Sequence, residues 1–223
     1  MSEADDFTAK WRARWPEWHI GGAFLPATQR EAAFAWLAML QELTDAAWGG
    51  ADATPGLAKL AWWNEELQGW AKGARRHPLG AVLQPLSGPW TPLAASLLPL
   101  QASRERPPAT DPGQAGIAAF ARAVADCERA LFEADAGMTG KDAGTGMVAF
   151  DLLAMRQLLH GDAADARRLL DAVPSPAGAT RPRRLQSTFL RQRLRYLAAN
   201  GQGHPPAAWR TLWLAWRAAR RTG

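Results

Sequence analysis

Two neighbouring glutamates, Glu65 and Glu66, are the first side chains whose types and spacing suggest chemistry. A pair of carboxylates could donate and abstract protons as a general acid and a general base. The apolar residues around them recur at steps of three and four, which predicts a helix with one apolar face. That face is made of Leu60, Trp63, Leu67 and Trp70. Because both glutamates fall outside it, we interpret them as exposed charges of the helix rather than as an acid and a base.

Candidate residues for a phosphate-binding loop and for a zinc site do not have the types or spacing that these sites require. Gly140 and Lys141 suggest a phosphate-binding loop, but Asp142 stands where that motif requires Ser or Thr. The histidines are scattered, so a zinc site is not expected. His160 ends an apolar segment, where it would cap the helix or face a pocket, and we favour the cap. Cys127 is the only cysteine, so it forms no intramolecular disulfide, and its apolar neighbours predict a buried, inert thiol.

Length and composition predict one domain with a packed core. The chain has 223 residues, of which 48% are hydrophobic, and we expect a single domain over residues 1–223. Tryptophan is abundant, and several tryptophans recur at helical spacing with Leu or Ala: Trp36, Trp63, Trp70, Trp209, Trp213 and Trp216. We interpret these as core anchors between helices, with an aromatic-lined pocket for an apolar ligand as the alternative.

Charge is unevenly distributed along the chain. Residues 1–155 carry 13 Lys and Arg against 18 Asp and Glu, a net charge of −5, whereas residues 156–223 carry 13 Arg against 3 Asp, a net of +10. This basic part is either a solvated surface or a site for an anion such as a lipid headgroup or a diphosphate. A nucleic-acid partner is not expected, because no RNA-binding signature, zinc-ligand set or helix-turn-helix pattern accompanies the arginines.

The first residues and the hydropathy of the chain indicate in which cellular compartment the protein is expected. The opening residues MSEADDFTAKWRARW are acidic and lack the apolar centre of a secretory signal. No run approaches the ~18 apolar residues that a membrane-spanning helix needs. We therefore expect a cytoplasmic protein, with peripheral association at the inner membrane as a further expectation from its basic part.

The pattern of apolar residues predicts an all-α fold, because Val and Ile are few and strand-like alternation is absent. After an irregular start, Thr28 is expected to cap the first helix. Loops are expected at residues 104–113, 137–146 and 173–182. The expected helices are residues 28–48, 57–72, 78–86, 115–136, 147–159, 163–172, 183–199 and 206–221, and a further apolar segment covers residues 91–102.

Four segments, taken in chain order, resemble the squalene/phytoene synthase family. Phe24-Leu25-Pro26-Ala27 with Arg30 resembles the Leu-Pro turn and Arg before that family's first aspartate motif. The run LAWWNEEL, followed by His77-Pro78, is similar to its Leu-x-Trp-Trp-x-Glu-Glu and His-Pro-Val segments. DARRLLDAVP resembles the segment after the second aspartate motif, and HPPAAWRTLWLAWRAARR resembles the closing helix of short bacterial members.

The resemblance implies a single helical bundle of the isoprenoid (terpene) synthase type around a central cavity. Active members join two prenyl diphosphates with Mg²⁺ held by carboxylates on two facing helices. On this resemblance, the metal ligands would be Asp45 and Asp165, helped by Asp162 or Glu42. The motifs are incomplete, because an indole, Trp48, stands where the first motif has a ligand.

The same resemblance implies which side chains would line the cavity: Leu37, Gln41, Thr44, Trp48, Met155 and His160. For Asp45 and Asp165, a solvated or helix-capping role is the structural alternative.

Three functions therefore stay open. The first is a catalytically degenerate family member, a pseudoenzyme without a cofactor, that binds an isoprenoid or another lipid or acts as an accessory factor. The second is an active Mg²⁺-dependent prenyltransferase that condenses prenyl diphosphates. The third is a peripheral membrane or protein-interaction module that uses the Arg-rich C-terminal helices.

Overall fold

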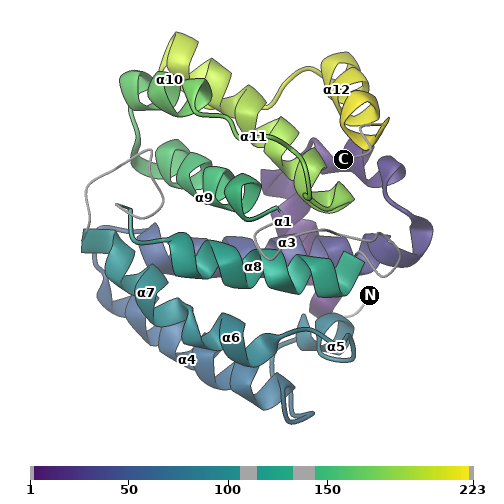
Figure 1. The fold of residues 1–223 in the computed structure, drawn as a ribbon, viewed down its shortest axis with the longest axis vertical. Coiled ribbons are helices and arrows are strands. Elements are labelled where there is room, and N and C mark those ends of the chain that lie inside the picture. Colours follow the sequence, from purple (N-terminus) through teal and green to yellow (C-terminus); the bar gives the residue numbers. More distant parts are fainter. Residues whose placement is uncertain (1–2, 106–114, 133–143, 221–223) are drawn as a thin grey trace.

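The computed structural model describes residues 3–105, 115–132 and 144–220. Within these ranges every regular element is helical, so the prediction of an all-α fold is confirmed (Figure 1). The elements are α1 Glu3–Arg14, α2 Trp18–Gly21, η1 Gly22–Phe24, α3 Ala27–Trp48, α4 Thr54–Trp70, α5 Gly80–Leu83, α6 Trp90–Ala95, α7 Leu97–Ala102, η2 Ser103–Glu105, α8 Ala118–Phe132, α9 Thr145–His160, α10 Ala163–Asp171, α11 Arg181–Asn200 and α12 Ala208–Arg220.

The helices pack in successive layers (Figure 1). At one end of the molecule, α4 packs against α6 and α7, and its other neighbour is the long helix α3. The helix α8 lies beside α9, and α9 packs against α11. At the other end, α11 also packs against α10 and α12. The N-terminal helix α1 packs on α3. The α11–α12 pair is therefore an outer layer, separated from α4 by the helices between them.

Tryptophan rings form much of the inner core. Trp36, Trp63 and Trp70 are buried, as predicted. Ring contacts run from Trp62 to Trp63 at 5.4 Å, on to Trp70 at 6.1 Å, and then to Trp90 at 5.2 Å between ring centroids. Trp90 also contacts Trp36 of α3 at 6.4 Å. Large buried aromatic rings of this kind dominate packing energy, so these contacts bind α3, α4 and α6 together.

A buried group of ions joins the remaining layers. Arg183 of α11 donates from Nη1 to Asp151 Oδ2 of α9 at 2.7 Å and from Nε to Glu128 Oε2 of α8 at 3.1 Å. Trp36 Nε1 of α3 donates to Glu128 Oε1 at 2.8 Å. The three charged side chains are all buried. Breaking such a group by removing one partner costs about 3–5 kcal/mol, because it leaves an uncompensated buried charge.

Glu66 is buried, so the prediction that it is an exposed charge is wrong. Only 1% of its side chain is exposed, against 72% for Glu65, whose predicted exposure is confirmed. The carboxylate accepts hydrogen bonds from Trp70 Nε1 at 2.8 Å, from the backbone N–H groups of Arg76 and His77 at 2.6 and 2.8 Å, and from Arg76 Nε at 3.0 Å. Burial alone would raise the pKa of Glu66, but these hydrogen bonds hold it below its usual range. The chain turns back after α4, and this carboxylate holds the turn.

Most expected helices lie within a few residues of their predicted ends, with four differences. The expected irregular start contains the helix α1. Thr28 does not cap α3, whose N-terminal cap is the backbone of Pro26. The apolar segment at 91–102 forms two helices, α6 and α7, which are divided at Ser96, and the helix expected at 78–86 is shortened to α5. The loops expected at 104–113 and 137–146 lie largely outside the described residues. Cys127 is buried as predicted, and burial raises the pKa of its thiol.

Replacing Glu66 tests its role in holding the turn. Glu66→Gln is expected to lower the free energy of unfolding by about 1–3 kcal/mol, because an amide NH₂ would face N–H donors. Glu65→Gln is the matched control on the neighbouring exposed side chain and is expected to change it by less than about 0.5 kcal/mol. Urea unfolding at neutral pH measures both, and equal effects of the two variants would contradict the assignment.

The pH dependence of stability tests the ion group. Burial raises the pKa of Asp151 to about 6, although Arg183 opposes the shift. A raised folded-state pKa gives stability that is present below pH ~4 and lost as the pH rises to about 6, by up to ~1.4 kcal/mol per pH unit. Asp151→Asn removes this contribution. The difference in unfolding free energy, wild type minus variant, should therefore fall between about pH 4 and 6; a flat or rising difference would show that Asp151 is not so perturbed.

Candidate functional site

The predicted carboxylates of α3 are each paired with a cation. Asp45 Oδ2 accepts a hydrogen bond from Arg14 Nη1 of α1 at 2.6 Å, and its Oδ1 accepts from Gln41 Nε2 at 2.7 Å. Glu42 forms an ion pair with Lys59 of α4. These two carboxylates therefore join α3 to α1 and to α4, two different neighbours.

The predicted carboxylates near the end of α9 lie in the first turn of α10. Asp162 caps this helix, because its Oδ1 accepts from the backbone N–H of Asp165 at 2.8 Å. Asp165 forms an ion pair with Arg168, one turn further along. Acidic side chains at a helix N-terminus are stabilised by the helix dipole. Asp162 thus plays the structural role of a helix cap.

These residues do not fit a Mg²⁺ site. Magnesium requires several oxygen ligands in near-octahedral geometry. In residues 3–105, 115–132 and 144–220, no three His, Cys, Asp or Glu side chains come together as a metal site would need. The carboxylates of Asp45, Glu42 and Asp165 already form ion pairs with Arg or Lys side chains. The assignment of these residues as metal ligands therefore remains a prediction from the resemblance.

The ends of α3 and α9 nevertheless meet. His160 Nε2 lies 2.5 Å from the backbone carbonyl oxygen of Trp48, so this nitrogen carries the proton and donates it. His160 is thus a cap, but of α3 rather than of its own helix. The indole of Trp48 is buried and donates to Ser103 Oγ at 2.9 Å. Trp48 therefore anchors the segment after α7 to the end of α3.

A cavity of about 160 Å³ lies between α3, α9 and α11, and Gln41 and Met155 line it. Arg14, Trp15 and Arg193 also contribute to its wall. The other predicted lining residues, Leu37, Thr44, Trp48 and His160, lie elsewhere: Leu37 and Thr44 are buried, and the Thr44 hydroxyl bonds the carbonyl of Leu40. Ligand pockets commonly measure about 300–1,000 Å³, so this cavity is small for an isoprenoid chain.

The polar groups of this cavity bind one another. Trp15 Nε1 donates to Gln41 Oε1 at 3.0 Å, and Gln41 in turn donates to Asp45. The guanidinium of Arg193 lies 3.9 Å from the centroid of the Trp15 ring and donates to both Glu17 oxygens at 2.7 and 2.8 Å. The ion pair between Glu17 and Arg193 joins residues 176 positions apart, and no sequence signal pointed to it. The hydrogen bonds and the ion pair around the cavity therefore hold the N-terminal segment against α3 and α11.

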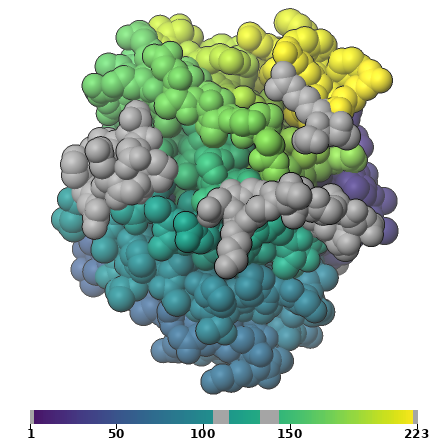
Figure 2. All heavy atoms as spheres, viewed as in Figure 1, coloured from purple at the N-terminus to yellow at the C-terminus, as the bar shows by residue number. Residues whose placement is uncertain are grey.

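The tryptophans of α12 are exposed, which corrects their assignment to the core. Trp209, Trp213 and Trp216 are 74%, 50% and 46% exposed. Leu212 is 53% exposed on the same side. We call these four residues the tryptophan face. Figure 2 shows α12, in yellow, at an outer corner of the molecule.

The opposite side of α12 packs on the protein with small residues. Thr211, Ala215 and Ala218 are buried, and α12 contacts α11, α2 and η1. The spacing of 211, 215 and 218 is itself helical, so it could have shown that the tryptophans face away. Arginines stack on the tryptophan face: Arg217 lies 5.3 Å from the centroid of the Trp213 ring, and Arg220 lies 4.8 Å from that of Trp216.

No helix within the described ranges is both long and apolar enough to cross a membrane.

Comparison of the chain with protein-family models, with curated proteins and with solved structures found no match.

Adding Mg²⁺ is expected to leave the melting temperature unchanged relative to KCl of equal ionic strength. Mg²⁺ at 100 times the dissociation constant of a site would stabilise the folded protein by about 2.7 kcal/mol. That stability would raise the melting temperature of a domain of this size by about 2–4 °C per kcal/mol. Scanning calorimetry measures the shift. A Mg²⁺-dependent rise that disappears in Asp45→Asn or Asp165→Asn would restore these residues as metal ligands.

Proposed function

We propose that this protein is a non-catalytic helical protein that binds the surface of anionic membranes through α12. The observation that carries the proposal is the tryptophan face, which combines three exposed tryptophans with stacked arginines. The resemblance to squalene/phytoene synthases supports the proposal of an isoprenoid-synthase-type scaffold, cytoplasmic and peripheral at the inner membrane, that serves as an accessory factor there.

The chemistry of α12 suits the boundary between lipid headgroups and acyl chains. An amphipathic helix can lie in this boundary with its apolar face inserted, and tryptophan is favoured there because its ring is apolar and its N–H is polar. Basic residues near the surface contribute about 1 kcal/mol each with anionic lipids. Residues 156–223 carry a net charge of +10 in the sequence; Arg183 and Arg193 are buried in ion pairs with earlier helices, but Arg217 and Arg220 lie on the tryptophan face itself. Apolar insertion and charge attraction thus act on the same side.

The described residues supply no observation that favours a prenyltransferase. The carboxylates that would hold the metal are paired with cations or cap a helix. The cavity lined by Gln41 and Met155 measures about 160 Å³. Turnover of farnesyl or geranylgeranyl diphosphate with Mg²⁺ at ~1 s⁻¹ or faster would overturn the non-catalytic part of the proposal.

Co-sedimentation with vesicles tests the membrane part. Wild-type protein is expected to bind vesicles that contain phosphatidylglycerol, with affinity that falls steeply as salt rises from low to physiological concentration. The triple variant Trp209→Ala, Trp213→Ala, Trp216→Ala should lose at least about tenfold in affinity, because it removes the inserting rings.

The matched control replaces exposed leucines on other helices. Leu57→Ala and Leu98→Ala remove side chains that are 36% and 69% exposed on α4 and α7, and this double variant should bind like wild type. Circular dichroism checks that each variant is folded. Absence of binding at low salt, or equal losses in the control, would refute the role of α12.

A further inference from the structure

The imidazole ring of His77 lies between aromatic rings of two helices. Its centroid is 4.5 Å from that of Trp63 and 5.8 Å from that of Trp62, both in α4. On the other side, the ring of Phe7 in α1 is 4.7 Å away. His77 itself belongs to the turn between α4 and α5, which Glu66 holds through the backbone N–H of His77. The imidazole ring therefore joins the N-terminal helix to this turn.

A hydrogen bond from the backbone fixes which ring nitrogen carries the proton. The N–H of Leu79 donates to Nδ1 of His77 at 3.1 Å. Nδ1 is therefore the acceptor, and in the neutral ring the proton is on Nε2. Leu79 is fully buried and lies one residue before α5 begins at Gly80. His77 thus supplies the acceptor for a buried N–H at the start of α5.

A proton and the Leu79 N–H compete for the same lone pair of Nδ1. An imidazolium ring carries hydrogen on both nitrogens, so a protonated His77 has no lone pair with which to accept from Leu79. Two N–H groups would then point at one another, and the ring must turn or move away. The buried N–H of Leu79 would be left without an acceptor, which is costly. Protonation therefore breaks the contact that holds the start of α5.

The protonation of the ring also depends on the charged groups of the elements packed around it. Burial lowers the pKa of His77 and Lys59 acts in the same direction, whereas Glu42 and Glu66 raise it. The net shift is downward, so the ring is neutral in the folded protein at neutral pH. The charged groups on these elements are Glu66 and Lys59 of α4, Glu42 of α3, Glu3 and Lys10 of α1, one turn from Phe7 on either side, and Arg76 of the turn itself.

We propose that His77 is a pH-sensitive switch, whose protonation at Nδ1 frees the start of α5 and releases Phe7, so that the first half of α1 leaves the turn. The second half of α1 has contacts of its own, because Trp11 packs 5.7 Å from the ring of Trp18 and Arg14 forms an ion pair with Asp45. The opening is therefore local. The switch uses no residue of α11 or α12, so it stands independently of the proposed membrane function.

The first arm of the test is an NMR titration of the wild-type protein from about pH 7.5 to about pH 5. The neutral His77 ring should carry its proton on Nε2 and should titrate below about pH 6.5. The amide proton resonance of Leu79 should shift with the same midpoint. A ring that titrates while the Leu79 resonance stays unchanged would overturn the proposal. A neutral ring with its proton on Nδ1, or a ring that stays neutral until the whole protein unfolds, would overturn it as well.

The second arm measures the opening by amide hydrogen exchange, corrected for the pH dependence of exchange itself. Protection of residues 79–83 should fall by up to about tenfold per pH unit below about pH 6.5, because the open state binds a proton that the closed state excludes. Nuclear Overhauser contacts between the rings of Phe7 and His77 should weaken over the same range, whereas α9 and α11 keep their protection. Loss of protection at residues 79–83 with unchanged contacts of Phe7 would refute its release.

A substitution that keeps the acceptor but removes the titration completes the test. In His77→Asn, the side-chain oxygen can accept from an N–H two residues further on, and an amide does not titrate in this range. Protection of residues 79–83 in this variant should not change between about pH 7.5 and 5. The matched control is His204→Asn, an exposed histidine that also precedes a proline, and it should keep the wild-type pH dependence. A pH dependence that persists in His77→Asn would assign the switch to another group, and the wild-type titration decides the matter if this variant does not fold.

Discussion

The buried ion group of Arg183, Glu128 and Asp151 is the constraint on which the arrangement of the molecule depends. It joins α11 to α8 and α9, and through Trp36 it reaches α3. Ions in a dry interior tolerate little displacement, because each must keep its partners. The group therefore fixes both the position of α11 and its rotation about its own axis.

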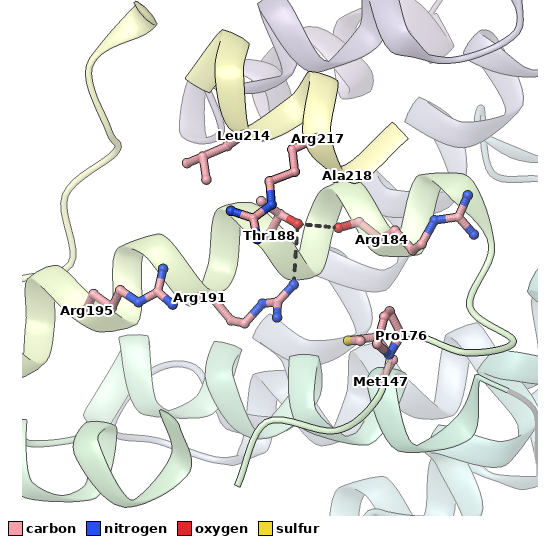
Figure 3. Close-up of a pocket in the computed structure, with 9 residues that line it drawn as sticks. All are labelled: Met147, Pro176, Arg184, Thr188, Arg191, Arg195, Leu214, Arg217 and Ala218. Carbon is pink, nitrogen blue, oxygen red and sulfur yellow. Dashed lines mark hydrogen bonds between the residues drawn. The ribbon is translucent and has the colours of Figure 1, made fainter. Parts of the chain in front are cut away.

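That rotation determines what α11 shows on each side. Arg183 and Arg193 turn inward, where each meets buried carboxylates. Arg184, Arg191 and Arg195 then fall on the outer side, which faces α12 (Figure 3). One helix thus uses the same residue type twice. The inward arginines are paired with buried carboxylates, whereas the outward ones line a space between α11 and α12.

Much of the fold was predictable from periodicity, because apolar steps of three and four reveal long helices such as α3, α9 and α11. What periodicity cannot give is the direction in which a face points. The tryptophans of α12 have the spacing of a core stripe, yet the small residues Thr211 and Ala215 occupy the buried side. Glu66 was misjudged for a related reason, since its partners are backbone N–H groups that approach only after the chain turns back.

The candidate site shows the same limit more strongly. The end of α3 lies near the end of α9, as the contact between Trp48 and His160 shows, but the resemblance placed the carboxylates of these regions around a metal. It could not reveal that Arg14 reaches Asp45 from α1, because that helix was itself not expected. Ion pairs between distant segments leave no local pattern in a sequence. The outer face of α11, in contrast, is visible in the spacing of its arginines once the buried side of that helix is known.

The way α12 is held has a consequence for its motion. Its buried contacts come from a threonine and two alanines, which remove few methyl and methylene groups from water. Helices with so little apolar contact belong to the part of a protein that opens locally at a free energy well below that of global unfolding. Local opening at α12 would leave the helices joined by the buried ion group folded.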